Sequence, residues 1–499
     1  MLRVKASTRD EDRGVPLIDS DLSRPDPARP FRIAMTVFVV VLVLALFPYT
    51  GDPTGDVKDL VISWAAGLLT AGWLVVSWRT GLRFRPPMLF MPFLVLLLAL
   101  HLAATFVSSY IGPGLQETRR LWALFLLYLL ASQIYQTPDQ ARRLMLALCG
   151  GMLVASLYGF SQKAGLDVIP WDDQSGSEYR GLPATFGNPN YAAHALILTL
   201  VMAVYLALNR RYRWCIVFVP VFAAHLYFTH QRAGVLALTG ALGLLVTGWL
   251  VRRWLARPAK AAALTLVIVA AAGIAGFLGA MVYAKLHTGS AYPLDASLLL
   301  RYNSYHSAAR MAARRPLLGY GPEAYSIESP RFWTPYEQEW FARELKMNAH
   351  VHNDILEVSV SAGLIAGGLY LAFLIFAVGH GLLAGYTERD AERRRMGFML
   401  AALFAAFLFD GCWGFNLYVP VSAAVLFLMA GVFEALCGRE RDSVSPERLP
   451  ATALVWRLAV IALALVAVTA DSRVFASEVY LRLGERQVHR GHPETARRL

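Results

Sequence analysis

The sequence has few charged residues, and this shortage limits what the protein can be. Only 16% of its 499 residues are Asp, Glu, Lys or Arg, whereas 56% are hydrophobic and the mean hydropathy is +0.45. Soluble globular domains carry about 25% charged residues. The composition therefore predicts a chain that lies largely within a membrane.

Cysteine is also scarce. The four cysteines, Cys149, Cys215, Cys412 and Cys437, all lie in or at the ends of apolar runs, where they are most simply small buried hydrophobes. Neither a disulfide framework nor a metal-ligand spacing is present. The sequence thus predicts no metal site and no cofactor.

Nucleic-acid binding is not indicated either. The net charge is +12, but the sequence has no basic groove with interleaved aromatic residues. The first apolar run follows a charged, proline-rich stretch and has no small-residue cleavage site, so we interpret it as a retained helix and not as a signal peptide.

Long apolar runs dominate the remainder of the chain. A transmembrane helix needs about 20 apolar residues, and only helices can span a bilayer in such numbers with every backbone group satisfied. We therefore expect an all-α polytopic membrane protein with about 12–13 transmembrane helices. The thirteen predicted runs are 33–49, 60–78, 87–109, 120–136, 143–163, 190–208, 214–230, 233–251, 261–284, 353–380, 397–414, 420–437 and 457–471.

The basic residues indicate the orientation of these helices. With the N-terminus inside, every alternate connection is rich in arginine, for example at 79–85, 210–213, 252–260 and 389–395. The opposite connections are poorer in Lys and Arg, as the positive-inside rule requires. We therefore expect a cytoplasmic segment 1–32, a transmembrane bundle 33–471 and a periplasmic tail 472–499.

Two connections on the predicted outer side are long enough to carry function. The first covers about 164–189, and the second covers about 285–351. Within the second, 298–314 has helical composition and Arg315-Pro316 ends it. We expect a large, partly helical periplasmic loop.

His352 is the first candidate for chemistry. It lies where the second loop meets an apolar helix, in His350-Val351-His352-Asn353-Asp354. Helical spacing would place Gly363 on its face and allow close approach of another helix. Histidine has a pKa suited to proton transfer, but an interfacial histidine bonded to a loop carbonyl is the plainer interpretation. A metal pair with His350 lacks a third ligand, because Asp354 and Glu357 are expected on other helix faces.

Arginines on the outer side are candidates for binding an anion. Arg232 lies at a tight outer turn, where it either binds phosphate through its fork or extends to the interface. Arg301 and Arg310 are nine residues apart on one predicted helix and so lie on opposite faces; at most one is expected to face a site. Arg119 and Arg120 would add positive potential at a helix start.

Asn188 and Asn190 flank Pro189 at the start of another helix. An asparagine in this position commonly caps the helix. The alternative is that these side chains hydrogen-bond sugar hydroxyls.

These segments together resemble the O-antigen ligase and polymerase superfamily of bacterial membrane glycosyltransferases. Arg232 and Leu236 match an Arg-x3-Leu motif, and His352, Asn353 and Gly363 match a His-(Asn/Ser/Gln)-x9-Gly motif. The ranges 180–190 and 299–325, which begin near Arg180 and Arg301, are similar to two further family segments. A threonine pair of some ligases is replaced here by Ala366 and Gly367, which departs from that ligase branch.

The resemblance implies an enzyme of the bacterial inner membrane with a GT-C-like transmembrane bundle and a site that faces the periplasm. The donor would be a glycan on undecaprenyl diphosphate, displaced with inversion by an acceptor hydroxyl. Arg232 and Arg301, or Arg310 in its place, would hold the diphosphate, and His352 would activate the acceptor. Asn188, Asn190, Arg180, Asn353, Arg119 and Arg120 would support substrate binding.

The acceptor stays open at this point. It is the lipid A core in a ligase, another lipid-linked repeat in a polymerase, and a protein Ser or Thr in an oligosaccharyltransferase. A transporter or flippase for polar lipids is the alternative of another class. It predicts ionisable residues near the bilayer midplane, and His101, His194, His225 and Asp410 lie within apolar runs.

The tail holds one more pattern. Gly484, Gly491 and Ala496 have the spacing of small residues in a tetratricopeptide helix and turn. We therefore consider that repeats begin here, with chance similarity as the alternative.

Overall fold

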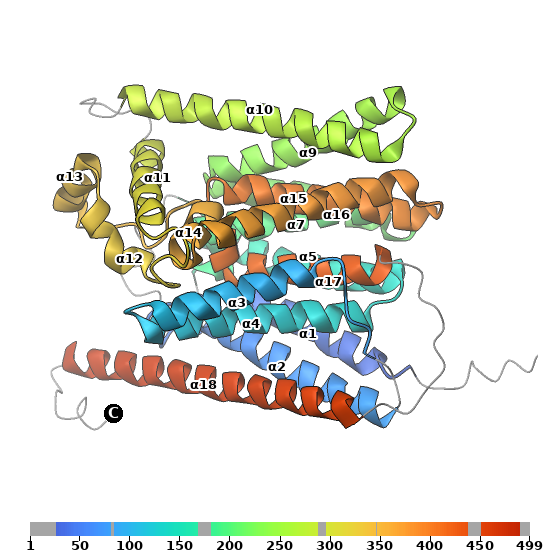
Figure 1. Cartoon of the computed structure of the whole chain (residues 1–499), viewed down its shortest axis with the longest axis horizontal. Helices are drawn as coiled ribbons and strands as arrows, with labels where there is room; N and C mark the ends of the chain where they lie inside the picture. The colour runs from blue at the N-terminus through green and yellow to red at the C-terminus, as the bar shows by residue number, and fades with distance from the viewer. Residues whose placement is uncertain are drawn as a thin grey trace, which may run out of the picture.

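The computed structural model is built from helices, and no strand occurs in the residues that it describes, which are 26–80, 84–167, 181–287, 296–345, 347–437 and 451–489. The long helices run roughly parallel or antiparallel as one bundle (Figure 1). The structure therefore agrees with an all-α polytopic membrane protein.

The helices follow the predicted apolar runs closely. In the first half of the chain they are α1 Arg29–Leu44, α2 Gly55–Arg79, α3 Met91–Val107, α4 Ile111–Ile134, α5 Pro138–Lys163, η2 Ala184–Phe186, α7 Pro189–Ala207, η3 Arg210–Val217 and α8 Phe218–Phe228. The second half holds α9 Arg232–Trp254, α10 Pro258–His287, α11 Ala296–Arg314, α12 Tyr325–Glu328, η4 Ser329–Phe332, α13 Pro335–Glu344, α14 Asp354–Ala362, α15 Leu364–Thr387, α16 Ala391–Gly411, η5 Asn416–Tyr418, α17 Pro420–Cys437 and α18 Ala451–His489.

Seven helices in the described residues are long and apolar enough to cross a membrane by themselves. They are 55–79, 138–163, 189–207, 232–254, 258–287, 364–387 and 454–488. Two shorter apolar helices, Met91–Val107 and Pro420–Leu436, lie among them. α10 and α18 form opposite edges of the bundle (Figure 1) and only 17% of each apolar segment is buried. Such exposed apolar faces need a lipid environment.

Three predicted runs differ in detail from the helices observed. The run 214–230 is divided between η3 and α8, and the run 457–471 is part of α18, which continues to His489. The run 353–380 is broken at Gly363 into α14 and α15. The prediction of one continuous helix from 353 to 380 was therefore wrong.

The break occurs at Gly363, where only glycine fits, for two reasons. Its φ of +94° is rarely adopted by residues that have a Cβ. A Cβ at this position would also lie 2.0 Å from the carbonyl oxygen of Leu317. The predicted small-residue face under His352 thus receives a backbone segment of the large loop, and not another helix.

The large outer loop is partly helical, as expected, and its helices α11, α12 and α13 gather at one end of the bundle (Figure 1). Backbone hydrogen bonds tie it to the α14–α15 break. Tyr320 N donates to Val360 O at 2.8 Å, Gly321 N to Ser361 O at 3.0 Å, and Leu364 N to Pro316 O at 2.8 Å. This part of the loop is therefore built into the bundle end.

Only part of the predicted repeat pattern in the tail lies within the described residues. Gly484 lies within α18, whereas Gly491 and Ala496 lie outside the described residues. The proposed start of tetratricopeptide repeats therefore stays a prediction.

Candidate functional site

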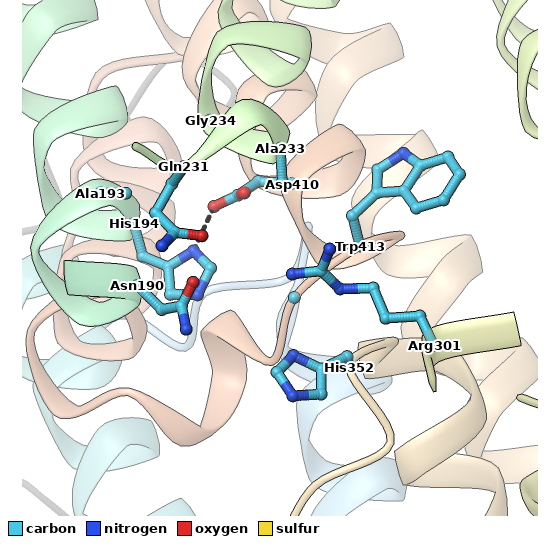
Figure 2. A pocket seen from close by; sticks show the side chains of 11 residues that line it. Asn190, Ala193, His194, Gln231, Ala233, Gly234, Arg301, His352, Asp410 and Trp413 are labelled. Atoms are coloured by element: carbon cyan, nitrogen blue, oxygen red, sulfur yellow. Dashed lines mark hydrogen bonds and ion pairs between the residues drawn. The ribbon is translucent and has the colours of Figure 1, made fainter. Parts of the chain in front are cut away.

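A polar pocket lies at the loop end of the bundle. It forms where α7, α9 and α11 begin and α16 ends, next to the loop that precedes α14 (Figure 2). Its volume is about 240 Å³, including the part open to solvent. It is lined by Asn190, Ala193, His194, Gln231, Ala233, Gly234, Arg301, His352, Asp410, Trp413 and Gly414.

His352 is held by its backbone at the edge of this pocket. It precedes α14, whose first turn is capped by Asn353, and its φ is +61°. Tyr305 of α11 donates a hydrogen bond to the carbonyl oxygen of His352 at 2.8 Å and contacts that of Cys412 at 3.0 Å. A left-handed conformation is uncommon for a residue with a side chain. The surrounding contacts therefore hold the imidazole in one place.

The imidazole of His352 is uncharged near neutral pH. Burial lowers its pKa well below 6.5, and the neighbouring Arg301, His350 and His194 lower it further. A neutral ring keeps a lone pair that can accept a hydrogen bond or a proton. The ring also lies edge-on to Phe415, with 4.9 Å between ring centroids.

Arg301 reaches the pocket from the second turn of α11, as Figure 2 shows. Its Nε is buried and has no hydrogen-bond partner among the described residues. An unpaired guanidinium nitrogen is a donor that an anionic oxygen can satisfy. The side chain is therefore suited to bind a phosphate oxygen.

Two further ionisable residues line the pocket, and the sequence analysis did not assign them a role. His194 of α7 and Asp410 of α16 lie 2.6 Å apart, from Nδ1 to Oδ2, and the contact is dashed in Figure 2. They are separated by 216 positions in the chain. The only signal in the sequence was their occurrence within apolar runs, where ionisable residues are costly and commonly functional.

A different set of charges surrounds His350. It stacks on the ring of Phe415 with centroids 4.5 Å apart, and its Nδ1 is 2.6 Å from Glu357 Oε1. Burial lowers the pKa of His350, but Glu357 and Glu323 outweigh this and raise it to about 9. The expectation that Glu357 points away from the histidines was therefore wrong, because His350 precedes the helix and folds back over it.

Of the two asparagines at the start of α7, one caps the helix and the other lines the pocket. Asn188 caps α7, since its Oδ1 accepts from the backbone nitrogen of Asn190 at 2.9 Å. Asn190 lines the pocket. Asn353 caps α14, and its Nδ2 donates to Cys412 O at 3.1 Å.

Four arginines named from the sequence do not line the pocket. Arg232 is exposed at the first position of α9, beside the lining residues Gln231 and Ala233. Arg310 is exposed on α11 and donates to the carbonyl oxygen of Phe332. It is thus on the face opposite Arg301, as their spacing predicted.

Arg119 and Arg120 of α4 are engaged elsewhere. Arg119 Nε contacts Asp471 Oδ1 of α18 at 2.7 Å. Arg120 is paired with Glu117, with Nη2 and Oε1 2.7 Å apart, and lies over the ring of Tyr418. Arg180 lies outside the described residues.

No group of three or more His, Cys, Asp or Glu side chains with the arrangement of a metal site occurs in the part of the chain that the structure describes. In particular, His350 stacks on Phe415, whereas His352 meets the same ring edge-on. The Nδ1 of His350 is already bonded to Glu357.

The fold and the pocket define a class of protein. It is a multi-pass membrane protein whose pocket, where the bundle meets its large loop, contains an arginine, an aspartate and two histidines. Residues 217–371 match the family model described as O-Antigen ligase. The match confirms the resemblance to the O-antigen ligase and polymerase superfamily, whose members have glycosyltransferase-type activity on lipid-linked glycans.

The matched segment runs from the end of η3 to α15 and contains Arg232, Arg301 and His352. It does not contain His194 or Asp410. No curated protein matches the chain.

Proposed function

We propose that the protein transfers a glycan from undecaprenyl diphosphate to an acceptor hydroxyl, with inversion and without a metal ion. One observation carries this proposal: Arg301, with an unsatisfied buried Nε, lines the same pocket as the uncharged imidazole of His352. A cation can bind the diphosphate leaving group. A neutral imidazole can bind or deprotonate the attacking hydroxyl.

Arg301 is the main diphosphate-binding residue in this proposal. Arg232 stands at the rim, next to Gln231 and Ala233 of the pocket wall, and would contact the more exposed phosphate. Guanidinium groups match phosphate oxygens bidentately. Two such groups would neutralise the charge that develops as the bond to the leaving group breaks.

His352 is the base or the group that orients the acceptor. Its carbonyl is fixed by Tyr305 and its ring lies against Phe415. A fixed ring keeps a reacting hydroxyl in position, which is where much of the gain from catalysis by proximity arises. Asn190 would hydrogen-bond a sugar hydroxyl in the same pocket.

The site faces the periplasm and the protein lies in the bacterial inner membrane in this proposal. The basic connections 79–85, 210–213, 252–260 and 389–395 all belong to the opposite end of the bundle from the large loop by chain order, and basic connections face the cytoplasm. We accordingly propose a cytoplasmic segment 1–32, a bundle 33–471 with the loop 285–351 outside, and a periplasmic tail 472–499.

Glycolipids from a deletion strain would identify the acceptor. Free lipid A core together with intact lipid-linked polymer, measured by mass spectrometry, would indicate a ligase. Single lipid-linked repeats would indicate a polymerase, and loss of glycan from proteins alone would indicate an oligosaccharyltransferase. A strain with unchanged glycans in all three pools would contradict the proposed transfer.

The proposal of a metal-independent reaction has its own test. Arginines can stabilise the leaving diphosphate without a divalent ion, so transfer should persist when EDTA is added to washed membranes. Activity that disappears in EDTA and returns with magnesium or manganese would contradict it.

One observation favours a transporter as the second candidate. His194 and Asp410 form a buried ionisable pair between two helices of the bundle, as proton-coupled transporters often have. Detergent micelles separate the two functions, because they contain no compartments. Glycan transfer by the purified protein in micelles requires an enzyme, whereas a transporter would be inactive there.

A further inference from the structure

The roles described so far do not use the two most deeply buried ionisable groups of the pocket. His194 is 5% exposed and Asp410 is 2% exposed. Both lie on helices of the bundle and outside the segment that matches the family. An ionisable pair within an apolar bundle costs free energy to bury. A role in the site would explain why this pair is present.

The contact between the two residues determines which of their atoms are left without a hydrogen-bond partner among the described residues. A neutral imidazole that donates its Nδ1 hydrogen to Asp410 Oδ2 carries a lone pair on Nε2. This Nε2 and Asp410 Oδ1 are both buried and have no hydrogen-bond partner among the described residues. Both atoms are acceptors, so the ligand that satisfies them must supply a hydrogen donor, as a hydroxyl group does.

The opposite side of the pocket has the opposite requirement. There the unsatisfied atom is the Nε of Arg301, which is a donor and calls for an anionic oxygen. Figure 2 shows Arg301 on one side, His194 and Asn190 across from it, and His352 below the guanidinium group of Arg301. The pocket is thus suited to a phosphate on one side and a hydroxyl on the other.

This division agrees with the stereochemistry of an inverting displacement. The nucleophile must approach the anomeric carbon from the face opposite the leaving group. If Arg301 holds the diphosphate, the acceptor hydroxyl lies on the side of His194. His352 lines the same pocket. Burial and, after it, the positive charge of Arg301 lower its pKa, so its ring is a weak base that is suited to orient the acceptor hydroxyl through a hydrogen bond.

His225 shows that burial alone does not define such a site. It also lies within the bundle, with Nδ1 2.9 Å from Ser156 Oγ and an Nε2 that has no partner among the described residues. It does not line the pocket, and its partner is a neutral hydroxyl. His194 differs in both respects.

We propose that His194, paired with Asp410, accepts the proton of the acceptor hydroxyl, while His352 orients the acceptor. In this step the acceptor oxygen bonds to the anomeric carbon. The bond from that carbon to the diphosphate oxygen breaks, and its electron pair leaves with the diphosphate. The proton moves to Nε2 of His194, Asp410 stabilises the imidazolium, and water takes the proton after the product departs.

This inference rests on the proposed function, and two measurements separate them. The first is binding of undecaprenyl diphosphate to the purified full-length protein, which reports the Arg301 side. The second is the initial rate of glycan transfer in membranes of the deletion strain, followed as a function of pH. The titratable or charged groups that line the pocket are His194, Asp410, His352 and Arg301.

We expect His194→Gln and Asp410→Asn to lower the transfer rate by roughly 10²–10⁴-fold, the range for loss of a general base. Both should still bind undecaprenyl diphosphate, and the matched control His225→Gln should transfer at the wild-type rate. His194→Gln should also lose the decline in rate at acid pH, because that decline reflects protonation of the base. His352→Ala should be slow but keep the decline.

Transfer at the wild-type rate by His194→Gln and Asp410→Asn would overturn the proposal. A slow His194→Gln variant that keeps the wild-type pH dependence would overturn it as well, because the pair would then be structural. Failure of the wild-type protein to bind undecaprenyl diphosphate would instead contradict the proposed function itself.

Loss of one partner leaves a buried unpaired group, which can prevent folding. The double variant His194→Phe/Asp410→Leu removes both polar groups and avoids this problem. If it binds undecaprenyl diphosphate without transferring glycan, the proposal is supported. If it transfers glycan at the wild-type rate, the proposal is overturned.

Discussion

His350 and His352 are separated by one residue and both contact Phe415, one stacked on the ring and the other edge-on to it, yet they lie in opposite electrostatic surroundings. On one side His350 meets the carboxylate of Glu357 at 2.6 Å, and its pKa is raised to about 9. In the pocket, burial and then the positive charge of Arg301 hold the pKa of His352 well below 6.5. Near neutral pH one ring is charged and the other is not.

The difference teaches that position in the sequence does not assign the chemistry of a histidine here. The backbone has the uncommon φ of +61° at His352, and the two neighbouring histidines have different surroundings, since His350 bonds to Glu357 and His352 lines the pocket. The Glu357 side contains groups suited to holding the loop. The Arg301 side contains groups suited to binding a substrate. Substitutions on the two sides should therefore have different consequences.

The largest effect is expected for His352 itself. His352→Ala should lower turnover by roughly 10²–10⁴-fold, the range for removal of a proton-transferring or closely orienting group, and leave undecaprenyl diphosphate binding intact. The measurement is transfer in purified membranes. His306→Ala, at an exposed histidine of α11, is the control. Near-normal transfer by His352→Ala would remove this residue from the mechanism.

Arg301 offers the next comparison, because Arg310 lies on the opposite face of the same helix. Arg301→Lys keeps the charge but loses the bidentate fork. Loss of one charge-assisted hydrogen bond is worth about 1.5–3 kcal/mol, so undecaprenyl diphosphate should bind roughly 10–100-fold more weakly.

Arg310→Lys is the matched control for this substitution. Arg310 is exposed and bonded to the carbonyl of Phe332, so its replacement should leave binding unchanged. Equal affinities for the two variants would show that the pocket face of α11 does not select the diphosphate.

Much of this pocket could be predicted from the sequence. Arg301 and His352 stood out because polar residues at the junction of a long loop and an apolar helix are unusual. Asn190 stood out because it opens a helix. Each of these signals is local, and local patterns are what a single sequence shows best.

The remainder depends on contacts between distant segments. His194 and Asp410 are 216 positions apart, and nothing in either apolar run indicates its partner. The break at Gly363 depends on the carbonyl of Leu317, which approaches from the large loop. The pairing of His350 with Glu357 requires a reversal of the chain before α14. None of these features has a periodic signature.

A substitution that removes the contact of His350 with Glu357 should lower the stability of the protein and leave substrate binding unchanged. A rise in the pKa of His350 from 6.5 to about 9 corresponds to roughly 3 kcal/mol at most. Because the pKa is raised in the folded state, this stabilisation is complete below about 6.5 and is lost as the pH rises through about 9.

His350→Gln should therefore lower the unfolding midpoint in detergent strongly at pH values below 6.5 and much less above 9. The same His306→Ala variant is a suitable control, because His306 is exposed. Its contact on α11 is with the side chain of Tyr302. An equal loss of stability at both pH values would mean that the ion pair does not hold the loop.

The smallest effect is expected for a substitution at Tyr305, whose hydroxyl bonds to the backbone beside the pocket. Its hydroxyl lies 2.8 Å from His352 O and 3.0 Å from Cys412 O, so it ties α11 to the two segments that carry the imidazole and Trp413. Tyr305→Phe removes a hydrogen bond worth about 0.5–1.5 kcal/mol and should lower turnover by up to roughly tenfold. Affinity for undecaprenyl diphosphate should not change, because Arg301 is untouched.

Tyr302→Phe removes an exposed hydroxyl from the same helix and is the matched control. If both variants have the same turnover, the position of the His352 backbone does not limit the reaction, and orientation by this loop cannot be the role of His352.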